Sequence, residues 1–146
     1  MQVDVFLANE QELDVDEARL TSLARHVLVA EEVDDNAELS VLCVTSSHMR
    51  QLNSHFAGDD YATDVLAFPM GEDDDGALLL GDVVICPDVA RRHADERGST
   101  LNDELETLVV HGTLHLLGYE HQGEDDKRQM DGRLHEVLRS FKPYRH

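Results

Sequence analysis

Three histidines in the C-terminal third of the chain have the type and spacing of metal ligands. His111, His115 and His121 occur in the segment HGTLHLLGYEH. Residues four apart share one face of a helix, with Cα atoms about 6 Å apart along its axis, so His111 and His115 are expected to converge on one cation. Gly118 is expected to end that helix and let the chain turn, which would bring His121 back toward the same point. The spacing predicts a metal site at the C-terminal end of a helix.

Neutral imidazole ligands favour zinc, and three of them leave one coordination position open. Catalytic zinc sites keep that position for water, whereas structural sites are closed by four protein ligands. We therefore expect one Zn²⁺ and hydrolytic chemistry, with His115 as a catalytic residue as well as a ligand. Glu120, next to His121, is a candidate general base or a hydrogen-bond partner that orients a histidine, and a solvent-exposed role is equally open. His135, in a polar helical segment, is interpreted as a surface residue.

The same histidine spacing occurs in the metzincin proteases, which makes peptide hydrolysis an alternative. In those enzymes a glutamate directly after the first histidine acts as the general base. Gly112 occupies that position here. The residue types therefore argue against a protease, and the base must come from another part of the site.

The charge of the chain is strongly negative. Its 31 acidic and 12 basic residues give a formal net charge of −19 over 146 residues. Such a surface repels nucleic acids and anionic membranes at low salt. It is explained either as a solubilising surface or as an adaptation to a saline cytoplasm, because at about 1 M salt the Debye length is only about 3 Å.

The cysteines and the N-terminal segment indicate a cytoplasmic protein. Cys43 and Cys86 each lie within an apolar run, so we expect both thiols to be buried, reduced and structural, with zinc ligation or a disulfide as the alternative. The N-terminal segment lacks the pattern of a signal peptide, and no apolar run approaches the roughly 20 residues that span a bilayer. We expect no membrane partner.

Hydrophobic periodicity predicts a single domain over residues 1–146 in the α+β class. The apolar patterns alternate irregularly between strand and helix periods, without regular βαβ repetition. Apolar content is 41% with no Trp, so aliphatic side chains must fill the core. Strands are predicted at 3–8, 38–45, 63–68 and 78–86, and helices at 16–31, 46–55, 87–98, 100–118 and 125–140.

The histidine segment resembles the signature of the YbeY family of bacterial rRNA-maturation endoribonucleases, which usually reads HGxLHLxGYDH. Further blocks match in the same order along nearly the whole chain. They are LN at 52–53, TDVLAFP at 63–69 where the family tends to have PTDVLSFP, LGDVVIC at 80–86, and the stretch ELETLVVHG.

The resemblance implies an α+β zinc protein with a mostly parallel or mixed four-stranded sheet. It also implies single-strand-specific endoribonuclease activity, processing of the small-subunit rRNA 3′ end, and a role in ribosome quality control. His111, His115 and His121 match the family's three zinc ligands. The implied partners are single-stranded rRNA and the ribosome or a small-subunit protein, with no DNA partner expected.

The sequence departs from the family pattern where many members carry an arginine in a context like YRGKDKPT. The equivalent stretch here is FAGDDYAT, with Ala57 in the arginine position. An arginine there would suit phosphate binding through its bidentate fork. Two alternatives remain open. Either another cation such as Arg50, Arg91 or Arg92 takes the role, or the protein is a zinc-stabilised ribosome-assembly factor with little or no cleavage activity.

The TDVLAF block also has two interpretations. Thr63 and Asp64 either lie near the metal and contact substrate, or fix a loop through hydrogen bonds from side chain to backbone.

Overall fold

The computed structural model describes residues 3–71, 78–119 and 123–141, and within these ranges it contains four strands and five helices. The predicted elements are all present, with ends displaced by a few residues. The elements are β1 (Asp4–Glu10), α1 (Glu17–Ala30), β2 (Ala37–Val44), α2 (Ser46–Ala57), β3 (Val65–Pro69), β4 (Leu78–Ile85), α3 (Pro87–Arg97), α4 (Leu101–Leu116) and α5 (Glu124–Phe141).

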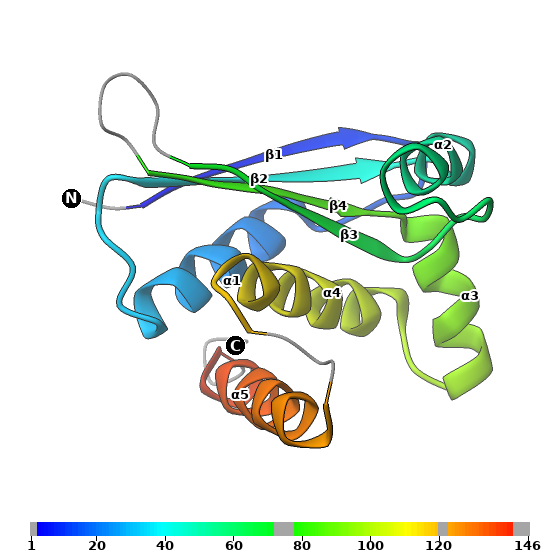
Figure 1. Ribbon diagram of the computed structural model, residues 1–146. Helices are drawn as coiled ribbons and strands as arrows, with labels where there is room; N and C mark the ends of the chain where they lie inside the picture. The colour runs from blue at the N-terminus through cyan, green and yellow to red at the C-terminus, as the bar shows by residue number, and fades with distance from the viewer. Residues whose placement is uncertain (1–2, 72–77, 120–122, 142–146) are drawn as a thin grey trace.

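The strands form one mixed sheet, as expected for the α+β class. Among the described residues the strand order is β1-β2-β4-β3. β1, β2 and β4 are mutually parallel, and β3 pairs with β4 in the antiparallel direction. β3 therefore occupies one edge of the sheet and runs against the direction of its neighbour (Figure 1).

Helices cover one face of this sheet in two layers. Figure 1 shows α1 and α4 next to each other beneath the strands, with α5 beneath them, and all three helices are in mutual contact. The core between the layers is aliphatic, as the absence of Trp requires. Its largest fully buried side chains include Leu23, Leu39, Ile85, Leu105 and Leu114. Burying a side chain of this size stabilises the fold by about 1.5–3 kcal/mol.

α4 is the helix around which the others are arranged, because it contacts α1, α3, α5, β3 and β4. Thr100 caps its N-terminus, where the Thr100 hydroxyl accepts a hydrogen bond of 3.1 Å from the backbone N–H of Asp103. Gly118 follows its last turn with a φ of 103°, a conformation that favours glycine. The predicted start and end of this helix are confirmed. They place His111 and His115 in its last two turns.

A smaller apolar cluster lies under α2 on the opposite face of the sheet. It contains Val44, Met49, Val84, Cys86 and Val89. Cys43 and Cys86 are both buried and free, as predicted. None of the described helices is long and apolar enough to cross a bilayer.

Candidate metal centre

His111 and His115 lie beside the edge strand β3. His111 is half-buried and His115 is exposed. Both side chains lie at the groove between α4 and β3, with His115 at its solvent-exposed end. A cavity of about 200 Å³ in this groove is lined by Val65, Leu66, Ala67, His111, Gly112 and His115. The two imidazoles thus line one cavity from adjacent turns of one helix, an arrangement that fits the predicted zinc ion.

Gly112 brings the helix very close to the sheet. A Cβ atom at this position would lie 2.6 Å from Cγ1 of Val83 and 3.4 Å from Cγ2 of Val65. Separations below 3.0 Å do not occur for real Cβ atoms, so a larger residue would force the helix and sheet apart. The side chains of Val83 and Val65 therefore occupy the space that a glutamate side chain at position 112 would need. This packing is a physical reason why position 112 carries no protease-type base.

The β3 residues that line the histidine cavity carry backbone groups on the outer edge of the sheet. The Cys86 N–H donates to the Asp64 carbonyl at 2.9 Å, and the Met70 N–H donates to the Leu80 carbonyl at 3.2 Å. In an antiparallel pair, residues alternate between bonding the neighbouring strand and pointing away from it. The even-numbered residues of β3 therefore bond to β4, and the N–H groups of Val65 and Ala67 point away from β4 at the sheet edge.

The chain that leaves α4 is attached to two other helices by a polar network. The Tyr119 hydroxyl donates to Oε1 of Glu31 at 2.6 Å, and Nε of Arg133 donates to Oε2 of the same carboxylate at 2.7 Å. Arg133 also donates to the Ala30 carbonyl at 3.1 Å. The hydrogen bond to Glu31 raises the pKa of Tyr119. The network fixes the chain two residues before His121.

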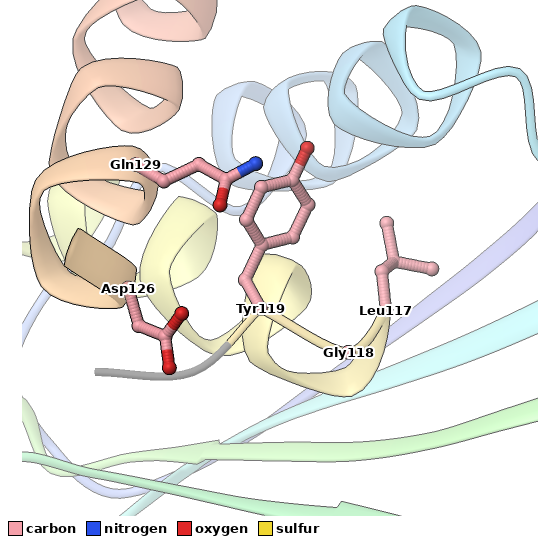
Figure 2. Close-up of a pocket in the computed structure, with 5 residues that line it drawn as sticks. All are labelled: Leu117, Gly118, Tyr119, Asp126 and Gln129. Carbon is pink, nitrogen blue, oxygen red and sulfur yellow. The ribbon is translucent and has the colours of Figure 1, made fainter. Parts of the chain in front are cut away.

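A second cavity, of about 320 Å³, lies where α4 ends. Figure 2 shows the ring of Tyr119 directed toward α1, with Asp126 and Gln129 entering from α5. Leu117 and Gly118 complete its described lining.

The structure brings together two of the three predicted metal ligands. His121 and Glu120 lie outside the described residues. The third ligand and the candidate base therefore remain predictions from the sequence. His135 is exposed on α5, in agreement with its interpretation as a surface residue.

The arginines considered as substitutes for the family arginine lie away from the lining of the histidine cavity. Arg50 forms a bidentate ion pair with Asp60, at 2.8 and 3.0 Å. Arg91 and Arg92 are exposed on α3. Ala57 is the last residue of α2 and is also exposed. The charge of Arg50 is thus already engaged by a carboxylate.

His93 lies close to Asp64, a proximity that the sequence spacing does not reveal. Its Nδ1 lies 3.5 Å from Oδ2 of Asp64, the residue directly before β3. The Asp64 carbonyl also accepts the Cys86 N–H, so Asp64 is bonded to the sheet through its backbone, while its carboxylate lies next to His93 of α3. Neither of these two contacts is a hydrogen bond from the Asp64 side chain to the backbone, so both interpretations of Asp64 stay predictions.

The fold and the site together define an α+β protein with a paired-histidine candidate metal site beside an antiparallel edge strand. A family model described as Endoribonuclease YbeY matches residues 6–142. The chain therefore belongs to the YbeY family.

Individual relatives agree with this assignment. The chain is 48% identical over 137 residues to Endoribonuclease YbeY of Frankia casuarinae, covering 86% of this chain and 68% of that protein. It is 44% identical over 149 residues to the Thermobifida fusca protein of the same name, covering 97% and 95% respectively. The solution structure of TM1509 from Thermotoga maritima is similar, with a TM-score of 0.62 and 26% identity over 97% of this chain and 92% of that one.

Proposed function

We propose that this protein is a zinc-dependent endoribonuclease that cleaves single-stranded rRNA, in a single domain comprising residues 1–146. The observation that carries the proposal is the position of His111 and His115, which line one cavity beside an edge strand in a member of an endoribonuclease family. Its proposed setting is the cytoplasm, in small-subunit rRNA 3′ end maturation and ribosome quality control. The ribosome or a small-subunit protein is the proposed partner, without DNA or membrane partners.

His111, His115 and His121 are the proposed zinc ligands. When bound, Zn²⁺ would supply positive charge next to the scissile phosphate and lower the pKa of water. The contact of Gly112 with Val83 holds the helix, and with it both histidines, at a fixed height over the sheet. Glu120 is proposed either to accept a proton or to orient a neighbouring histidine.

The exposure of His115 suits a polymeric substrate. A long RNA chain needs a groove that is open to solvent, and His115 lies at the exposed end of this one. His111 is half-buried and lines the same cavity one turn earlier in α4.

A ribosome-assembly factor with little or no cleavage activity is the second candidate function. It is favoured by Ala57, which lacks the family's guanidinium, and by the engagement of Arg50 with Asp60. The net charge of −19 also opposes RNA binding.

The test compares cleavage of single-stranded and duplex rRNA fragments by the purified protein before and after treatment with EDTA. The proposal predicts cleavage of the single strand, its loss when metal is removed and its recovery when zinc is returned. A folded protein that contains stoichiometric zinc but cleaves neither fragment would favour the assembly factor instead.

A further inference from the structure

We propose that the outer edge of β3 binds the phosphate backbone of the RNA substrate, with the backbone N–H groups of Val65 and Ala67 donating hydrogen bonds to phosphate oxygens. The inference rests on the proposed endoribonuclease function and adds to it a substrate-positioning element. In this proposal backbone groups bind the phosphate, and a pattern of side chains in the sequence does not predict such a site.

The first support is the direction of the two N–H groups. Hydrogen bonds at both ends of the β3–β4 pairing put Asp64 and Met70 in bonded pairs with β4. The alternation of an antiparallel ladder then turns the N–H groups of Val65 and Ala67 to the opposite side, about 7 Å apart along the strand. Two donors with the same direction are thus presented at the sheet edge, together with the outward carbonyl groups of the same two residues.

The second support is the location of these donors. Val65, Leu66 and Ala67 line the same cavity as His111 and His115. The Val65 side chain packs toward Gly112, between the two histidines in sequence. A phosphate held at the strand edge would therefore lie in the groove of the candidate metal centre.

The third support is the electrostatic character of the chain. Ala57 carries no charge, and Arg50 is paired with Asp60. Backbone N–H groups carry no net charge, yet they donate hydrogen bonds to anions, and the edge of a sheet can bind an anion. They allow a chain with a net charge of −19 to hold a phosphate without a guanidinium at position 57.

The form of the edge favours a phosphate over an extended peptide. β3 is only five residues long, and its next outward-facing position is Pro69, which has no N–H. Addition of a peptide strand draws its affinity from a continuous series of backbone bonds. The outward edge of β3 offers two N–H groups, each with the carbonyl of the same residue beside it, and then a proline, so the series of backbone bonds open to an added strand is short.

The decisive variant replaces the Ala67 amide with an ester by incorporating lactic acid at this position, which removes the N–H and keeps the side chain. Ala67→Pro is the second variant, because an edge strand tolerates proline where the N–H points outward. Ala67→Gly is the matched control, since it keeps the N–H and removes only the methyl group. Zinc content and thermal unfolding are measured for every variant.

Two readouts separate this inference from the proposed function. The first is kcat/KM for a single-stranded rRNA fragment. The second is the affinity of the metal-free protein for an uncleavable 2′-O-methyl oligonucleotide. Because a hydrogen bond to a charged group is worth about a tenfold to hundredfold change, we expect losses of that size for the ester and proline variants in both readouts. The control should stay within about threefold, and the salt dependence of binding should be unchanged because no charge is removed.

Unchanged cleavage and unchanged oligonucleotide affinity in the folded ester variant would overturn the inference and make an extended peptide the better occupant of the edge. Failure of the wild-type protein to cleave RNA would instead contradict the proposed function. The binding measurement on metal-free protein still tests the edge in that case.

Discussion

Gly112 and Val83 approach so closely that α4 and β4 have no room for a side chain between them. A Cβ atom at Gly112 would lie 2.6 Å from Cγ1 of Val83. Protein interiors are close-packed, so this contact fixes the height of the helix over the sheet. His111 and His115, on either side in sequence, are thereby held against β3.

Replacing Gly112 with alanine should destabilise the protein even though alanine is the better helix former. Overpacking destabilises the fold by about 1–3 kcal/mol, and the higher helix propensity of alanine stabilises it by about 1 kcal/mol. We therefore expect the free energy of unfolding to fall by up to about 2 kcal/mol. Urea unfolding measures the change. Gly132→Ala is the matched control, because a Cβ at Gly132 in α5 meets nothing within 4 Å. That variant should gain about 0.5–1 kcal/mol, and equal effects at both positions would contradict the packing argument.

Removing the Glu31 carboxylate should loosen the chain beyond α4. Glu31→Ala leaves the Tyr119 hydroxyl and the Arg133 guanidinium without the acceptor that they share. We expect the free energy of unfolding to fall by about 1–3 kcal/mol, because the side chain of Glu31 is 12% exposed. Asp131→Ala, at an exposed position of α5, should change stability by less than about 0.5 kcal/mol. A loss no larger for Glu31 than for Asp131 would show that the network contributes nothing.

Hydrogen exchange should alternate along β3. The amide protons of Leu66 and Phe68 bond to β4 and should be protected, whereas those of Val65 and Ala67 point outward and should exchange faster. The measurement is residue-resolved exchange by NMR, with the four amides serving as controls for one another. Slow exchange at Ala67 with fast exchange at Leu66 would mean that the N–H of Ala67, and not that of Leu66, bonds to β4.

The Cys43 thiol should stay unreactive in the folded protein at neutral pH. Burial raises its pKa from 9.0 to about 11. Because the folded state holds the proton more tightly than the unfolded state, the associated stability is complete below about pH 9 and is lost as pH rises toward 11. The Cys86→Ala variant leaves Cys43 as the only thiol, and its reaction with a disulfide reagent at pH 8 should require unfolding. Rapid labelling of the native variant would contradict the burial.

Much of the scaffold was predictable because its signals are local. Thr100 and Gly118 mark the two ends of α4 through capping chemistry, and the spacing of His111 and His115 follows from the helical repeat. The family motif supplied the expectation of a mixed sheet. The helix ends and the histidine spacing depend on residues within a few positions of one another, whereas the mixed sheet pairs distant strands and was expected only from the family resemblance.

The groove itself was not predictable from local patterns. Val65 and His111 are brought together by the position of β3 at the sheet edge, which depends on its antiparallel pairing with β4. The network that joins Glu31 to Tyr119 and Arg133 links residues 88 and 102 positions apart. Neither arrangement leaves a periodic signal in the sequence, because each arises from the packing of whole elements.

The most direct test of the proposed function is cleavage of a single-stranded rRNA fragment by the His115→Ala variant, compared with wild type and with His135→Ala. His135 is exposed on α5 and outside the groove, so its variant controls for the loss of a histidine. We predict that His115→Ala stays folded by circular dichroism, loses zinc and loses at least about a hundredfold in kcat/KM, while His135→Ala cleaves like wild type. Wild-type cleavage by a folded, zinc-free His115→Ala protein would contradict a metal-dependent nuclease centred on α4.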